Sequence, residues 1–156
     1  LENISINILY DIFIESFQDF PIASESNLKT FHEMLKNNKY NPMILIGAFN
    51  TQTNELMGYV LNNINEKSDN TEYAILCATR PKFRRQGIMY KILKNTKQLL
   101  KQNQVVFYMT EVLQNNTPAL KLYESQGFVI RNEIITEIQT KTNSRYINQY
   151  ELILKI

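Results

Sequence analysis

A long amphipathic helix between two strands is the pattern that most constrains this chain. From residue 85 to about residue 102, apolar positions recur every three or four residues, as they do on one face of a helix. The runs at 72–79 and 105–112 on either side have the length of strands, and the second is rich in β-branched and aromatic residues. A strand, a helix and another strand in this order predict a mixed α/β layer.

Turn signals place the other elements around this unit. Thr117 and Pro118 form a start signal for a second helix, and Gly127 stands where that helix should end. The remaining predicted elements are a short strand at 4–8, helices at 10–20 and 24–36, a hairpin with strands at 43–49 and 56–64, and two last strands at 128–138 and 145–155. No internal repeat or linker interrupts them, so we expect a single domain over residues 1–156.

Composition excludes several kinds of function. The chain has four glycines, whereas an average chain of this length has about eleven, and it contains neither a G-x-G-x-x-G fingerprint nor a Walker A loop. One Cys and one His cannot build a zinc cluster or a disulfide framework, so we expect no metal. A net charge of +2 is too small to indicate nucleic-acid binding.

The sequence also indicates where the protein works and how it could assemble. It has no run of about 18 apolar residues and no signal-peptide pattern, so we expect a soluble cytoplasmic protein without membrane contacts. The apolar strand that ends at residues 150–156 could pair within a monomer or across a homodimer, and the sequence leaves both alternatives open.

The connection between the strand at 72–79 and the long helix is basic and contains one glycine. Gly87 would let the backbone approach a ligand closely, and Lys82, Arg84 and Arg85 could add charge-assisted hydrogen bonds to phosphate oxygens. The first N–H groups of a helix lack intrahelical acceptors and carry the positive end of its dipole, so this turn suits a pyrophosphate. A plain connection with a solvated basic turn explains the segment equally well.

Two motifs in this part of the chain resemble those of the GNAT N-acetyltransferases. The family's acetyl-CoA-binding pattern, Arg/Gln-x-x-Gly-x-Gly/Ala, falls on Arg84-Arg85-Gln86-Gly87-Ile88-Met89, with Pro81 three residues ahead. Met89 departs from it, because the family usually has a small residue there. The second pattern, Asn-x-x-Ala-x-x-x-Tyr-x-x-x-Gly-Phe, is complete at residues 116–128. Two motifs in the right order are more specific than either alone.

The resemblance implies a fold, a donor and a set of binding residues. The fold is α+β, with a mixed, mostly antiparallel sheet of about six to seven strands, helices on both faces and splayed central strands at the cofactor site. The donor is acetyl-CoA, whose pantetheine arm would pair with the main chain of residues 77–79. The implied cofactor-binding residues are Cys77, Ala78, Thr79, Lys82, Arg84, Arg85, Gln86, Gly87, Ile88, Met89, Tyr90, Asn116, Ala119 and Tyr123.

Acetyl transfer to an amine needs one group that takes a proton and another that protonates the departing thiolate. The resemblance implies Tyr123 as the acid, and a Tyr packed under the strands with a backbone-bonded hydroxyl is the alternative. Glu111, twelve residues before Tyr123, matches a position at which members of the family have a base acting through water. A partner for a neighbouring Lys or Arg is its alternative role. Glu72 is the alternative base, because other members place a carboxylate on that strand.

Three further residues near this centre have open roles. The backbone N–H of Val112 is our candidate donor to the thioester oxygen. Cys77 lies in an apolar run without a His nearby, which favours a small core residue over a nucleophile. Asn116 either caps the second helix or hydrogen-bonds the cofactor arm.

The acceptor is the least specified part of the prediction. Residues 15–25 mix acids with aromatics, which would suit an amine or a peptide N-terminus, although an ordinary solvated loop has the same composition. With Glu111, this segment favours a primary amine, carried by a small molecule or a protein and acetylated by direct attack in a ternary complex. The competing interpretation is a non-catalytic acyl-CoA-binding or regulatory module. Met89 favours that module, whereas Glu111 and Tyr123 disfavour it.

Overall fold

The computed structural model describes residues 4–18, 27–36, 43–64, 70–139 and 144–156. The described strands form one six-stranded sheet in the order β1-β2-β3-β4-β6-β5, in which β3 and β4 run parallel and the other neighbours antiparallel. This is the mixed, mostly antiparallel sheet that the sequence predicted. The elements are α1 (Ile6–Phe17), α3 (Leu28–Lys36), β1 (Met43–Phe49), β2 (Leu56–Ile64), β3 (Thr71–Thr79), a 3₁₀ turn (Pro81–Phe83), α4 (Ile88–Gln102), β4 (Phe107–Leu113), α5 (Thr117–Ser125), β5 (Val129–Gln139) and β6 (Ser144–Lys155).

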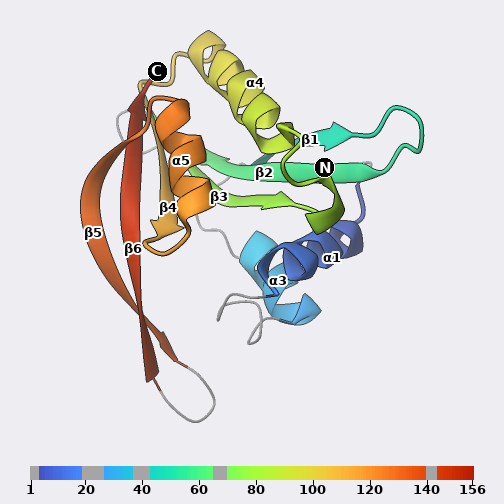
Figure 1. Ribbon diagram of the computed structural model, residues 1–156, viewed down its shortest axis with the longest axis horizontal. Coiled ribbons are helices and arrows are strands. Elements are labelled where there is room, and N and C mark those ends of the chain that lie inside the picture. The colour runs from blue at the N-terminus through green and yellow to red at the C-terminus, as the bar shows by residue number, and fades with distance from the viewer. Residues whose placement is uncertain (1–3, 19–26, 37–42, 65–69, 140–143) are drawn as a thin grey trace.

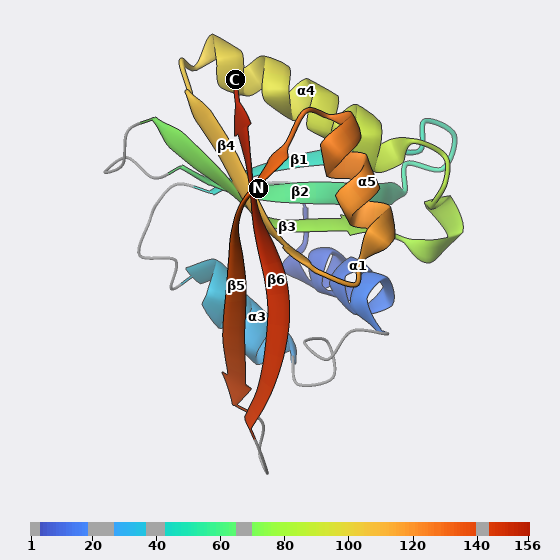
Figure 2. The same cartoon turned by 60° about the vertical axis from the view of Figure 1, so that its left-hand side comes forward.

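Helices cover both faces of the sheet, as predicted (Figures 1 and 2). α1 and α3 pack on one face through a cluster that includes Leu9 and Phe31, and α4 and α5 pack on the other through a cluster that includes Leu93. β2 serves both clusters because its side chains alternate: Tyr59 faces the first and Val60 the second. None of the described helices is long and apolar enough to cross a membrane.

The N-terminal element is a helix, so the predicted strand at 4–8 is wrong. Ser5 caps α1, since its Oγ accepts a hydrogen bond from the Asn7 N–H at 3.3 Å. The alternation of apolar residues at 4, 6 and 8 is overridden by a longer helical period, because the buried residues of α1 are Leu9, Ile12, Phe13 and Ser16. The predicted helix at 10–20 is the later part of α1, and residues 19 and 20 lie outside the described part of the chain.

Two other helix starts differ from their predicted positions. α4 begins at Ile88 rather than at residue 85, because Arg85 and Gly87 have φ angles of 63° and 72° that cannot continue a right-handed helix. The helix predicted at 24–36 is described from Leu28 onward as α3, where the Thr30 N–H donates to Asn27 Oδ1 at 2.9 Å. The proposed cap Ser24 lies outside the described residues.

β6 lies between β4 and β5 and is paired along both edges within the chain. Of the two pairings left open for residues 150–156, the one within a subunit is therefore the one observed. The β5–β6 hairpin is long and extends beyond the other strands of the sheet (Figure 1).

The central strands β3 and β4 are splayed, as the resemblance implied. They pair only over Thr71–Ala74 and Phe107–Thr110, although both continue further. The next residue of β3, Ile75, has no partner on β2, because Leu61 pairs with Leu76 and the following pair uses Ala74. This bulge bends β3 where its pairing with β4 stops, and a gap opens between the two strand ends.

Candidate active site

A pocket of about 1190 Å³ occupies the gap between β3 and β4. It exceeds the range of roughly 300–1,000 Å³ that is typical of small-molecule sites, so it has room for a long cofactor and a second substrate. The predicted site residues that line it are Cys77, Thr79, Arg84, Arg85, Gly87, Ile88, Met89, Tyr90, Glu111, Asn116, Ala119 and Tyr123. Residues more than forty positions apart in the sequence thus meet in one cavity.

Three residues predicted to bind the cofactor lie outside the pocket lining. Ala78 is buried in the cluster beneath α1. The Lys82 ammonium pairs with Glu55, with an Nζ–Oε1 distance of 2.7 Å, and so neutralises that carboxylate instead of facing the cavity. Gln86 Nε2 donates to the Lys82 carbonyl at 3.2 Å. The Lys82 ammonium and the Gln86 amide nitrogen have partners within the protein, so the pocket walls come from their neighbours.

The turn before α4 has the conformation of an anion-binding site. Gly87 is the N-cap of α4 with a φ of 72°, and a Cβ added there would meet no atom within 4 Å. The left-handed backbone therefore favours glycine, while the space beside it is open to a ligand. Gly87, Ile88 and Met89 line the pocket, so the unpaired N–H groups of the first helical turn lie at its wall. These features fit the pyrophosphate of a nucleotide-containing cofactor.

The backbone of β3 offers the pocket one well-placed residue. The Arg80 N–H donates to the Met57 carbonyl of β2 at 3.0 Å. Hydrogen-bonded pairs alternate along an antiparallel ladder, so the backbone N–H and C=O of Ala78 also bond to β2. The backbone groups of Cys77 and Thr79 therefore point to the opposite side, toward the gap. The Thr79 carbonyl already accepts Ser16 Oγ at 3.0 Å and Arg84 Nε at 3.3 Å. The main chain of Cys77 is therefore best placed to pair with an extended ligand.

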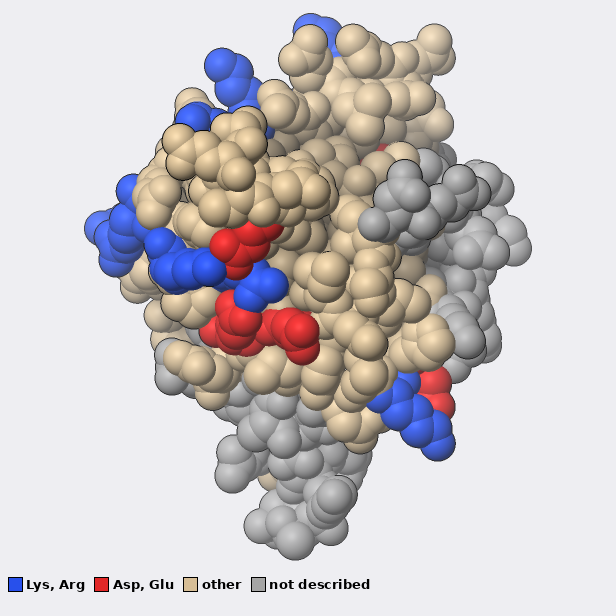
Figure 3. Space-filling model, turned by 90° about the vertical axis from the view of Figure 1, so that its right-hand side faces the viewer, with Lys and Arg blue, Asp and Glu red and all other residues tan. Residues whose placement is uncertain are grey.

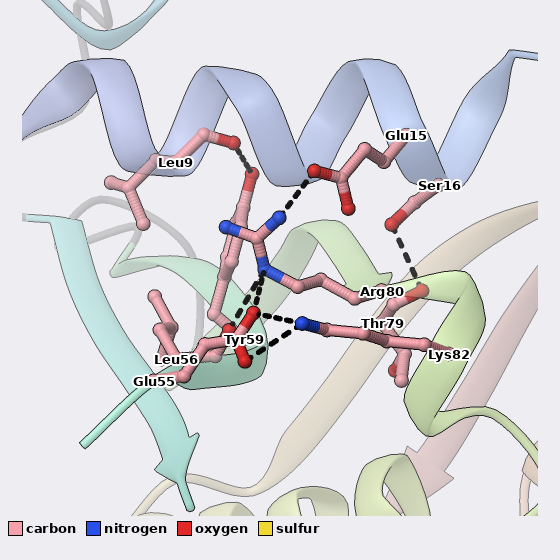
Figure 4. A network of polar contacts seen from close by, with 9 residues as sticks. All are labelled: Leu9, Glu15, Ser16, Glu55, Leu56, Tyr59, Thr79, Arg80 and Lys82. Atoms are coloured by element: carbon pink, nitrogen blue, oxygen red, sulfur yellow. Dashed lines mark hydrogen bonds and ion pairs between the residues drawn. The ribbon is translucent and has the colours of Figure 1, made fainter. Parts of the chain in front are cut away.

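A polar network fastens α1 to this end of β3 (Figure 4). The Arg80 guanidinium pairs with Glu15 of α1, and its Nε donates to the Leu56 carbonyl at 3.1 Å. Arg84 Nη2 donates to the Ser16 carbonyl at 2.7 Å. Acidic and basic side chains accordingly lie side by side at the middle of the face in Figure 3. The network holds the last turn of α1 against the pocket.

Tyr123 and Cys77 both line the pocket, and both keep their protons at neutral pH. Burial is the main cause that raises the pKa of Tyr123 well above its ordinary value, and the Cys77 side chain, to which it is hydrogen-bonded, adds to the effect, while a hydrogen bond with Thr110 opposes it. Burial also raises the pKa of the Cys77 thiol to about 11, so this thiol is a poor nucleophile at neutral pH.

Glu111 and Glu72, the two candidate bases, lie in different surroundings. Glu111 lines the pocket and is partly open to solvent, and partial desolvation of its carboxyl, followed by repulsion from Glu151, raises its pKa. Glu72 is only 2% exposed, is not part of the pocket lining, and has a pKa that burial raises to about 7. Of the two carboxylates, Glu111 is therefore the one with access to a bound substrate.

The predicted donor Val112 is wrong. The Gln114 N–H donates to the Asn148 carbonyl at 3.0 Å, which makes Val112 and Tyr150 the next hydrogen-bonded pair of the ladder. The Val112 N–H therefore points to β6 and away from the gap. Asn116, in contrast, is the N-cap of α5, where its Oδ1 accepts the Ala119 N–H at 3.3 Å, and it also lines the pocket.

Comparison with known proteins identifies the family. Residues 6–128 match the acetyltransferase (GNAT) family. The chain belongs to the GNAT acetyltransferase family. It is therefore an acyltransferase, and members of this family transfer an acyl group from acetyl-CoA to an amine.

Solved structures share the fold of this GNAT protein at low sequence identity. The ribosomal-protein-S18-alanine N-acetyltransferase from Escherichia coli has a TM-score of 0.77 and 21% identity, over 100% of this chain and 90% of that one. The ribosomal-protein-alanine N-acetyltransferase from Brucella melitensis has a TM-score of 0.76 and 14% identity, over 97% and 94%. The PaiA N-acetyltransferase from Thermoplasma acidophilum, in complex with coenzyme A, has a TM-score of 0.66 and 14% identity, over 97% and 92%. No curated protein sequence matches this chain.

Sequence reasoning missed part of the wall of this GNAT pocket. The unpredicted lining residues include Phe13, Ser16, Phe17, Tyr73, Ile75 and Gln149. Ser16 carried a signal that could have found it, because it is a polar residue on the buried, otherwise apolar face of α1. The others look like ordinary core or strand residues in sequence, and they reach the pocket only because β3 and β4 separate.

Proposed function

We propose that this GNAT protein transfers the acetyl group of acetyl-CoA to a primary amine by direct attack in a ternary complex. In this proposal Glu111 is the base, acting through a water molecule, and Tyr123 is the acid. The single observation that carries it is that Glu111 and Tyr123 line the same cavity as the glycine turn of α4.

The donor would lie along the turn and the end of β3. The N–H groups at the start of α4, with Arg84 and Arg85, would hold the pyrophosphate, and the main chain of Cys77 would pair with the pantetheine arm. Tyr123 and Glu111 line the same cavity as these residues. Acetyl-CoA supplies an activated thioester, and the protein supplies position and proton transfer.

The protonation states support the two assigned roles. An alkylammonium has a pKa near about 10 and must lose a proton before its nitrogen can attack, and Glu111, with a pKa above that of a free carboxyl, is a stronger proton acceptor than an ordinary glutamate. As the new C–N bond forms and the C–S bond breaks, Tyr123 donates its phenolic proton to the sulfur. The nitrogen loses two protons between ammonium and amide: Glu111 takes the first through water before the attack, and the second, released as the C–N bond forms, passes through solvent to the Tyr123 phenolate and restores its hydroxyl. The products are then the thiol, the amide and one proton held by Glu111, which balances the reaction.

The described acceptor wall fits an amine on a compact apolar stem. Phe13 and Phe17 of α1 and Tyr73 of β3 provide apolar surface, and Glu111 provides a negative charge for the ammonium. Residues 19–25 of the acidic and aromatic segment lie outside the described part of the chain.

Thiol release from acetyl-CoA, measured over a panel of amines, hydroxyl compounds and thiols, tests this function. We expect release only with primary amines, a gain of one acetyl group on the product by mass spectrometry, and intersecting initial-rate lines. Cys77→Ser should keep kcat within about threefold, because a thiol whose pKa is raised to about 11 stays protonated and forms no acetyl-enzyme. Acetyl-CoA binding without turnover on any amine would contradict the proposal and support a non-catalytic module.

A further inference from the structure

Resting on the function proposed above, we infer that Glu151 is a positioning residue that makes Glu111 a stronger base than an isolated carboxylate would be. Neither motif of the sequence includes Glu151, which lies on β6, one strand away from Glu111. The inference depends on the pairing of β4 with β6, on a bulge in β5, and on the charged side chains that this pairing and this bulge bring together.

The register of the sheet sets Glu111 directly opposite Glu151. The hydrogen-bonded pairs of this ladder fall at Val112 and at alternate residues of β4, so Glu111 and Glu151 form a non-hydrogen-bonded pair. Side chains are closest in such pairs, with Cβ atoms roughly 4.5–5.5 Å apart, and like charges there are unfavourable. A protein that needed only a stable sheet would gain nothing from this arrangement.

Glu151 is held in place from its other side. Arg131 has no partner on β6, because Ile130 pairs with Leu152 and Asn132 with Glu151. This bulge lets two consecutive residues reach the same carboxylate: Arg131 Nη1 lies 3.2 Å from Glu151 Oε1, and Asn132 Nδ2 donates to that oxygen at 3.1 Å. Glu151 is therefore anchored, with only 17% of its side chain exposed.

The charged groups around Glu111 allow Glu151 to raise the pKa of Glu111. Arg131 is half exposed, so solvent screens the positive charge behind Glu151. Burial first and Glu151 second raise the pKa of Glu111. The other titratable or charged side chains that line the pocket with Glu111 are Tyr73 and Cys77 on β3, Tyr123 on α5, Arg84 and Arg85 in the turn, and Tyr90 on α4. Burial raises the pKa values of Tyr123 and Cys77, so both stay neutral near pH 7, and the two arginines stand at the cofactor turn.

The pH profile of kcat/KM separates a tuning role from a structural one. At the pH where the kcat/KM of the wild type is half of its plateau value, we expect the kcat/KM of Glu151→Gln to be about four fifths of that variant's own plateau. The reason is that the acidic limb of its pH profile moves to lower pH. Arg131→Gln should fall to about one third at that pH, because Glu151 then acts without its counter-charge. Glu133→Gln is the matched control, since it removes the same charge from an exposed position of β5 and should leave the limb in place.

Two outcomes separate a failure of this inference from a failure of the proposed function. If Glu111→Gln abolishes the acidic limb while neither Glu151→Gln nor Arg131→Gln moves it, Glu111 is the base and our inference about Glu151 is wrong. If Glu111→Gln keeps both the limb and the rate, the assignment of the base fails, and the inference fails with it. Should Glu151→Gln not fold, the opposite shift in Arg131→Gln still decides the matter.

Discussion

The two ends of the β3–β4 pair contain similar residues in opposite situations. At the paired end, Glu72 and Tyr108 are enclosed, and the Tyr108 hydroxyl donates to Asn62 Oδ1 at 2.7 Å. At the separated end, Cys77 and Glu111 line a cavity. Each end holds a glutamate with a raised pKa, for burial alone at Glu72 and for burial plus a facing carboxylate at Glu111. The separation of the strands, rather than residue type, distinguishes a substrate-accessible carboxylate from an enclosed one.

The largest expected effect tests that distinction directly. Glu111→Gln should lower kcat by about 100- to 1,000-fold, because it removes the base, while Glu72→Gln should stay within about threefold. Steady-state thiol release at pH 8 measures both. A larger loss of activity in Glu72→Gln than in Glu111→Gln would reverse the comparison.

Glu72 should instead affect stability as a function of pH. Its pKa is about 7 in the folded protein and near 4.5 when exposed, so the native state keeps a proton that the unfolded chain has released between those pH values. The stabilisation is full below pH 4.5 and is lost as pH rises to about 7, by up to about 3 kcal/mol. Urea unfolding of the wild type and Glu72→Gln at pH 5 and pH 8 measures it, and an equal pH dependence in both would disprove the assignment.

Tyr123 and Tyr108 provide a second comparison between the separated end and the paired end of β3 and β4. Tyr123→Phe should lower kcat by about 10- to 100-fold, because the leaving sulfur loses its proton donor. Tyr108→Phe should leave kcat nearly unchanged but lower the free energy of unfolding by about 1–3 kcal/mol, since buried Asn62 Oδ1 loses its partner. Parallel kinetics and urea unfolding check both, and a catalytic defect in Tyr108→Phe without loss of stability would count against this division.

The smallest effect concerns two glycines with positive φ. Gly87→Ala and Gly127→Ala should each lower the free energy of unfolding by about 1–2 kcal/mol, because both positions are left-handed. Gly87→Ala alone should also raise KM for acetyl-CoA, since Gly87 lines the pocket whereas Gly127 lies against Leu154. An equal rise in KM for both variants would show that backbone strain, and not the pocket wall, sets cofactor affinity.

Local signals predicted the segments around the cofactor turn well. The period of α4, the turn with Gly87, the proline near the start of α5 and the hairpin of β1 and β2 all have short-range causes, and the structure confirms them. The strand expected at 4–8 failed because a capping Ser5 and the apolar face of α1 outweigh an alternation that rests on only three apolar residues.

The rest could not be predicted because it depends on register between distant strands. The direction of the Val112 N–H follows from its pairing with Tyr150, and the absence of Lys82 from the pocket wall follows from its ion pair with Glu55, in the turn just before β2. The pairing of Glu111 with Glu151 likewise joins residues forty positions apart. Composition and periodicity contain no information on such pairs, which only the order and offset of the strands define.

The position of β6 has a consequence for biosynthesis. β6 is translated after every other described strand, yet it belongs between β4 and β5. Until it emerges, β4 has an unpaired edge and β5 has no neighbour in the sheet, so a nascent chain exposes two strands that can pair with other chains. Because Gln149 of the pocket wall also comes from β6, the enzyme completes that wall in the same step that closes its sheet.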